Sequence, residues 1–135
     1  MSAEEMAKIG FLCLKKGVFH NKRIVSEKWL EESTKVRLCC GEKFRNMAYG
    51  YLWWIIDENE GSYAAIGNSG NVIYVNADKD LVISIAATFK PAIFDRIEFI
   101  KGYIEPFAAK QHFRRSSRSA LAVRPGLSAI FTQKF

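Results

Sequence analysis

Two short apolar runs joined by a turn constrain this chain's fold more than any other feature. Val72 to Val75 and Leu81 to Ala87 are rich in β-branched residues, and residues 76–80 between them tolerate turn geometry. This pattern predicts an antiparallel hairpin. Because neither run alternates between apolar and polar residues, we expect both faces of the hairpin to be covered, as at the centre of a layered structure.

The segment before the hairpin predicts two helices and a short excursion between them. Ser2 and Glu5 form a capping box for a helix over residues 2–16, which Gly17 ends. Residues 18–25 then turn near His20, which we expect to be a solvated turn residue. Ser26 caps a shorter helix whose Trp29 is expected to pack on the body of the protein.

The remaining elements are a strand and a helix. Ala48 to Ile56 predicts a single strand with a heavy aromatic load in the core, after a surface loop over residues 35–47. Pro91 is placed to start a helix that Pro106 ends, with isoleucines at helical spacing at 93, 97, 100 and 104. The fold class is therefore α+β, with an antiparallel sheet of about three strands flanked by helices.

Several of these segments resemble, in their order, a known family. Tyr49-Gly50-Tyr51-x-Trp53-Trp54 is followed by Ala65-x-Gly67-x-x-Gly70-Asn71 and then by Tyr74-Val75 and Asp80-Leu81-Val82. This order is similar to the C-terminal part of the serine β-lactamase and penicillin-binding-protein superfamily, closest to its class C-like esterase, D-aminopeptidase and amide-hydrolase branches. The resemblance covers residues 2–107. It implies a partial β-lactamase-like fold whose sheet has an exposed edge, because the family's N-terminal strands are missing.

The nucleophile of that family is absent from this sequence. The family acylates the serine of a Ser-x-x-Lys motif, and no serine here has a lysine three positions on. Tyr74-Val75-Asn76 spells the family's Tyr-x-Asn but falls downstream of the strand that it should precede, so we interpret it as a coincidence. We therefore expect the chain to be inactive alone.

The resemblance assigns a narrow role to the residues just before the hairpin. Ala65-Ile66-Gly67 occupies the family's Lys-Thr-Gly place, with Ala65 and Ile66 beside the substrate and Gly67 allowing its approach. The backbone N–H of Asn68 would then be one of two oxyanion donors. Ala65 lacks the family's cation. An alternative register aligns Asn68-Ser69-Gly70 with the motif and makes Asn71 the donor after Gly70.

The charge of the chain divides it into two segments. The net charge is +6, yet residues 1–109 hold 14 basic and 14 acidic residues. Residues 110–135 hold no acid and six bases: Lys110, Arg114, Arg115, Arg118, Arg124 and Lys134. We expect residues 1–109 to be the domain and residues 110–135 to be a basic tail, disordered or non-native. Nucleic-acid binding through this tail is a weaker alternative.

Membrane, metal and cofactor sites are not expected. No apolar run reaches the 18 residues of a membrane span, and no signal peptide begins the chain, which indicates a cytoplasmic location as it stands. Three cysteines cannot all pair, which favours a reduced environment, and His20 and His112 are too isolated for a zinc site.

Two functional hypotheses of different class follow. In the first, the chain is a fragment of a β-lactamase-related serine hydrolase whose complete form acts on a small acyl or peptide substrate. In the second, it is a non-catalytic module that binds itself or another subunit. Both leave an uncovered sheet edge, so we expect a homo-oligomer.

Overall fold

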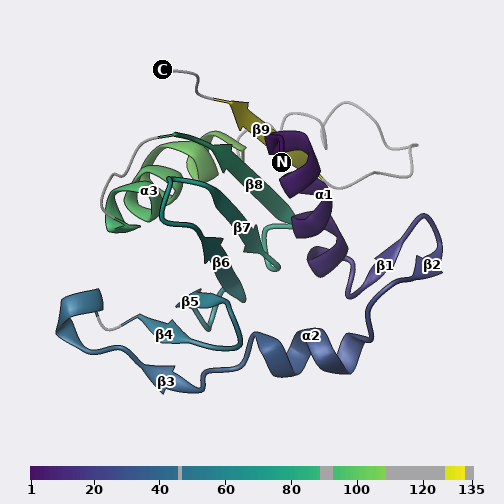
Figure 1. The fold of residues 1–135 in the computed structure, drawn as a ribbon, viewed down its shortest axis with the longest axis horizontal. Helices are drawn as coiled ribbons and strands as arrows, with labels where there is room; N and C mark the ends of the chain where they lie inside the picture. The colour runs from purple at the N-terminus through teal and green to yellow at the C-terminus, as the bar shows by residue number, and fades with distance from the viewer. Residues whose placement is uncertain (46, 89–92, 109–126, 133–135) are drawn as a thin grey trace.

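The computed structural model describes residues 1–45, 47–88, 93–108 and 127–132. In this part of the chain a two-stranded hairpin, β1–β2, accompanies a seven-stranded sheet of order β3-β4-β5-β6-β7-β8-β9 (Figure 1). The elements are α1 (Ala3–Leu14), β1 (Val18–Phe19), β2 (Lys22–Arg23), α2 (Glu27–Ser33), β3 (Leu38–Cys39), η1 (Glu42–Phe44), β4 (Ala48–Tyr49), β5 (Trp54–Asp57), β6 (Ser62–Ile66), β7 (Val72–Asn76), β8 (Leu81–Ala86), α3 (Ile93–Phe99), η2 (Ile100–Ile104) and β9 (Leu127–Thr132).

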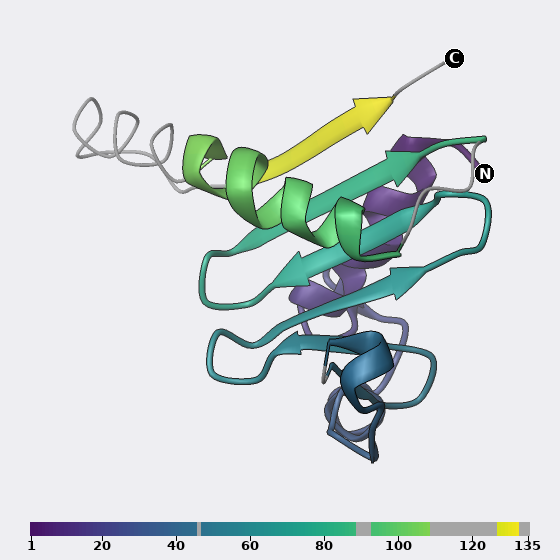
Figure 2. The ribbon, with the colours of Figure 1, turned by 90° about the vertical axis from the view of Figure 1, so that its left-hand side faces the viewer.

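The centre of the sheet lies between two helical layers. Helix α1 packs on one face, and α3 with η2 crosses the other (Figure 2). Val75 and Val82 are buried toward α1, whereas Tyr74 and Ile83 are buried toward α3. Both faces of the β7–β8 hairpin are therefore covered, as the lack of polar alternation predicted.

The class and the central hairpin match the sequence prediction. The fold is α+β, the sheet is antiparallel from β3 to β8, and β7 and β8 pair in the register Val75↔Val82. Asn76 shapes the turn because its Oδ1 accepts the N–H of Lys79 at 3.0 Å. The capping box of Ser2 and Glu5 and the cap at Ser26 are also present, at the starts of α1 and α2.

The sheet is larger than the three strands expected. Residues 48–56 form two strands, β4 and β5, because the chain turns back at Leu52, whose φ is 67°. Residues 62–66, which were not among the predicted strands, form β6 and pair with β5 and β7. Residues 35–47, expected as a loop, contain β3 and the short helix η1.

Two local predictions differ from the structure. Pro106 does not end the last helix, which continues to Ala108 through the π-helical turn η2. Proline lacks the N–H that an α-helix needs at this position, and the wider turn, in which Glu105 N–H donates to Ile100 O, accommodates it. Trp29 is 54% exposed and stacks on Tyr51 instead of packing on the body.

Strand β9 lies within the segment expected to be a tail. It pairs in parallel with β8, so β8 is not an edge strand of the sheet. The other end of the sheet is β3. The expected boundary at residue 109 and residues 109–126 lie outside the described residues, and the division into domain and tail stays a prediction.

Candidate functional site

The turn between β6 and β7 contains the residues to which the sequence assigned a role. Ala65 and Ile66 end β6 and are half-buried, and Gly67 begins the turn. The N–H of Gly67 donates to Asn71 O at 2.9 Å, and the N–H of Gly70 donates to Gly67 O at 3.2 Å. The turn is therefore closed by its own backbone at both ends.

The two glycines of this turn differ in what the backbone demands of them. Gly70 is buried with φ of 99°, a conformation that favours glycine. Gly67 is exposed, has no positive φ, and a Cβ placed there would meet Asn71 only at the ordinary distance of 3.7 Å. The fold explains Gly70, but it does not explain Gly67.

The peptide unit between Gly67 and Asn68 is held from one side. Its carbonyl oxygen accepts from Gly70 N–H and from Arg96 Nη1, the latter at 3.4 Å. In a trans peptide the N–H points opposite to the C=O. The N–H of Asn68 accordingly points away from Arg96, and it has no hydrogen-bond partner within the described part of the chain.

The side chain of Asn71, the donor in the alternative register, makes two hydrogen bonds. Its Oδ1 accepts the N–H of Ala87 at 3.1 Å, and its Nδ2 donates to Ser69 Oγ at 3.1 Å. The first bond joins the turn to the residue that follows β8, and the second lies within the turn. The residues of both registers thus lie within one turn, and the choice between Asn68 and Asn71 as donor stays a prediction.

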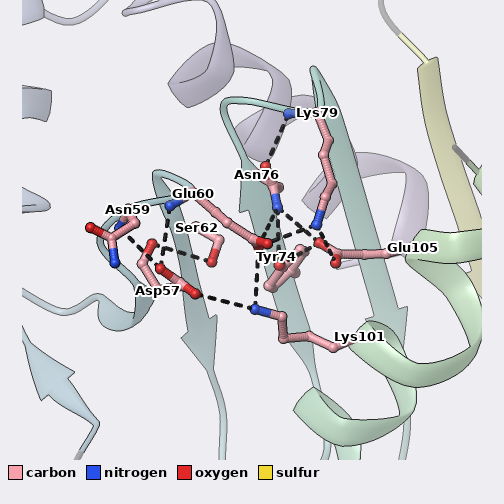
Figure 3. A network of polar contacts seen from close by, with 9 residues as sticks. All are labelled: Asp57, Asn59, Glu60, Ser62, Tyr74, Asn76, Lys79, Lys101 and Glu105. Carbon is pink, nitrogen blue, oxygen red and sulfur yellow. Dashed lines mark hydrogen bonds and ion pairs between the residues drawn. The ribbon is translucent and has the colours of Figure 1, made fainter.

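A second group of polar side chains lies beneath the C-terminal helix (Figure 3). Glu105 is 4% exposed, and it accepts from Tyr74 Oη at 2.5 Å, Asn76 Nδ2 at 2.9 Å and Lys79 Nζ at 2.9 Å. Burial raises the pKa of Tyr74, and the bond to Glu105 raises it further. The phenol is therefore protonated at neutral pH and acts as a donor.

This group continues to the surface through two lysines. Glu60 accepts from Lys79 at 3.2 Å and from Lys101 at 3.3 Å, and these bonds lower the pKa of the Glu60 carboxyl. Lys101 also lies 3.8 Å from Asp57. The network joins the β5–β6 turn, the β7–β8 hairpin and the last helix, so its role is to hold these elements together.

The Tyr74-Val75-Asn76 motif belongs to this network. Tyr74 and Asn76 are fully buried, point from β7 toward the last helix, and share Glu105. Asn76 ends β7, whereas the turn of Gly67 to Asn71 precedes its start at Val72. The interpretation of the motif as a coincidence stays a prediction.

A cavity of about 250 Å³ lies elsewhere, between α1, α2 and the β5–β6 hairpin. Cys13, Leu30, Ile55 and Tyr63 are among its lining residues. Burial raises the pKa of the Cys13 thiol to about 11, so the thiol is protonated at neutral pH and is a poor nucleophile. The cavity lining includes no residue of the Gly67 turn.

The described residues contain no group of three or more His, Cys, Asp or Glu side chains placed to bind a metal ion. Within the same residues, no helix combines the length and the apolar character needed to cross a membrane. Cys13, Cys39 and Cys40 are all free thiols.

Sequence reasoning missed two contributors to these sites. Arg96 reaches the candidate turn across 29 positions of sequence, and no local pattern signals that contact. Glu105 was overlooked although Tyr74 and Asn76, two residues apart, had to share one face of their strand. An acid on the helix covering that face was the available signal, but Asp95, Glu98 and Glu105 all lie on that helix, and only the structure selects Glu105.

A comparison with solved structures identifies the architecture. The chain is similar to a structure from Bacillus anthracis described as a 6-aminohexanoate-dimer hydrolase, with a TM-score of 0.57 and 22% sequence identity over 84% of this chain. The chain has part of a β-lactamase-like fold. It spans only 29% of the length of that hydrolase. No family model matches the sequence, and no curated protein matches it.

Proposed function

We propose that this chain is part of a β-lactamase-related serine hydrolase and that its Gly67–Asn71 turn supplies an oxyanion donor. The single observation that carries this proposal is the exposed peptide between Gly67 and Asn68. Its carbonyl is held by two donors while its N–H is without a partner among the described residues. The likeness in fold to a hydrolase supports the reaction class.

The chemistry of acyl transfer explains what such a turn contributes. When a nucleophile attacks an ester or amide carbonyl, negative charge develops on its oxygen. A backbone N–H aimed at that oxygen stabilises the transition state by about 3–4 kcal/mol. Gly67, which packing does not require, leaves room for the substrate to approach the backbone. The substrate class is a small acyl compound or peptide.

The same chemistry predicts that the isolated chain is inactive. The second oxyanion donor is usually the N–H of the nucleophile itself, and no Ser-x-x-Lys motif occurs in the 135 residues. We expect no hydrolysis of chromogenic β-lactams, p-nitrophenyl esters or D-alanyl peptides above background. A rate that scales with protein across preparations, with a serine-reactive probe labelling this chain, would contradict the proposal.

The decisive experiment reads the DNA upstream of this coding region and compares two variants at Asn68. DNA upstream of this coding region should encode Ser-x-x-Lys, and the joined reading frame should yield a hydrolase. In that protein Asn68→Pro removes the N–H donor, and position 68 accepts proline because it is the second residue of the turn. We expect kcat to fall about 10²–10³-fold. Asn68→Ala, which keeps the N–H, is the matched control, and absence of the upstream motif would overturn the proposal.

A self-associating module is the second candidate function, favoured by one observation. Phe99, Tyr103 and Phe107 recur every four residues along the last helix and are 50%, 74% and 61% exposed. The rings of Phe99 and Tyr103 lie 5.7 Å apart. Light scattering should show a dimer that Tyr103→Ser together with Phe107→Ser converts to monomer. A wild-type monomer at every concentration would contradict this candidate.

A further inference from the structure

Arg96 has an environment unlike that of the other basic residues whose exposure is described. It lies on α3 and is only 6% exposed, whereas a guanidinium rarely leaves water without acceptors to replace it. One acceptor is Gly67 O, which lies 29 positions earlier in the sequence, in the turn between β6 and β7. The carbonyl that receives this bond belongs to the peptide whose N–H is the candidate oxyanion donor.

A positive charge at one end of a peptide unit changes the other end. The guanidinium draws electron density toward the carbonyl oxygen, and this polarisation makes the N–H of the same unit more positive. Hydrogen bonds in such a chain strengthen one another by about 10–30% each. Arg96 itself is largely removed from water, where the effective dielectric constant is lower, and arginine keeps its charge at any relevant pH.

We propose that Arg96 is a positioning residue for the candidate site: it fixes the Gly67–Asn68 peptide from behind and strengthens the outward N–H of Asn68 as a donor to a substrate oxyanion. Gly70 N–H, the second donor to Gly67 O at 3.2 Å, holds the same plane. The role of the Asn68 N–H as an oxyanion donor rests on the proposed function. The polarisation of the peptide does not, and it can be measured on the 135-residue chain itself.

The test is amide NMR on the complete 135-residue chain, with acetate as the oxyanion probe. In the wild type, acetate should shift the Asn68 amide proton downfield more than any other amide of the turn. Arg96→Gln removes the charge while keeping a donor, and it should move the free Asn68 signal upfield and weaken the acetate response at least threefold. Arg96→Lys, which restores the charge, should recover most of the response.

Lys101→Gln is the matched control, since Lys101 is a cation on the same helical layer that contacts Glu60 instead of the turn. It should leave the Asn68 signal and its acetate response unchanged. A folded Arg96→Gln protein with wild-type Asn68 shift and acetate response would overturn the inference, because a purely structural arginine predicts that result.

A measurement on the wild type keeps the test decisive if Arg96→Gln does not fold. Base-catalysed hydrogen exchange removes a proton faster from a polarised N–H. Asn68 should therefore exchange faster than Ser69, its exposed neighbour, after correction for intrinsic sequence effects. Equal or slower exchange at Asn68 would overturn the inference. An upstream gene without Ser-x-x-Lys would instead overturn the proposed function and leave the polarised peptide standing.

Discussion

The two faces of the central sheet are covered by helices in physically different ways. On the α1 face the contact is apolar and close: Gly10 lies so near the sheet that a Cβ would come within 2.5 Å of Val82. A buried hydrogen bond also joins α1 to the sheet on this face, where the Ser84 hydroxyl donates to Ala3 O at 2.6 Å. On the opposite face, apolar packing of Ile83 and Ile100 is joined by the network around Glu105.

This difference separates two means of fixing a helix on a sheet. Shape complementarity fixes the distance between α1 and the sheet, because protein interiors are packed so closely that one added methyl group affects stability. A buried polar network requires specific partners and so selects one position of the helix, provided that every member is satisfied. The candidate turn depends on the second face, because Arg96 reaches it from α3.

Glu105→Ala should have the largest effect on this comparison. Tyr74 and Asn76 are fully buried and would lose their shared acceptor, which costs about 1–3 kcal/mol per unsatisfied group. We expect the free energy of unfolding to fall by about 3 kcal/mol in urea denaturation. Glu98→Ala is the control, since Glu98 pairs with Arg45 on the surface and such pairs contribute at most about 1 kcal/mol. An equal loss of unfolding free energy in the two variants would contradict a stabilising role for the Glu105 network.

Burial of Cys13 on the α1 face should make the free energy of unfolding depend on pH in the alkaline range. Burial raises the pKa of Cys13 from 9.0 to about 11, so the folded state holds the thiol proton more tightly than the unfolded state. The contribution of this thiol to the free energy of unfolding is fully present below pH 9. It decreases by about 2 kcal/mol as the pH rises toward 11. Cys13→Ala should flatten this decline in urea titrations between pH 8 and 11. An unchanged slope would show that the thiol is not buried on folding.

Gly10→Ala should have a smaller net effect, because two opposing terms partly cancel. Alanine favours the helix by about 1 kcal/mol, but overpacking against Val82 costs about 1–3 kcal/mol. We expect a net loss of about 1 kcal/mol and a lower melting temperature. Gly102→Ala is the control on the other face, where a Cβ meets nothing within 4 Å, and it should be neutral or stabilising. A stabilised Gly10→Ala protein would refute the close contact of α1.

Local sequence determined the elements whose signals are local. The capping box at Ser2 and Glu5, the cap at Ser26 and the β7–β8 hairpin all follow from side chains that interact within a few residues. The absence of Ser-x-x-Lys is likewise a fact of sequence alone. Gly67 and Gly70 are local signals too, because glycines before a strand mark a break in regular pairing.

Only the tertiary structure decided the features that depend on distant partners. The reversal at Leu52 gives β4 and β5 in place of one strand, because the two halves of the segment pair with each other in the register Tyr49↔Trp54. Helical packing on the sheet carries the last helix past Pro106 through a π-turn. Arg96 meets Gly67, and Glu105 meets Tyr74, across about thirty residues, and sequence spacing carries no information about such contacts once the chain has crossed from one layer to another.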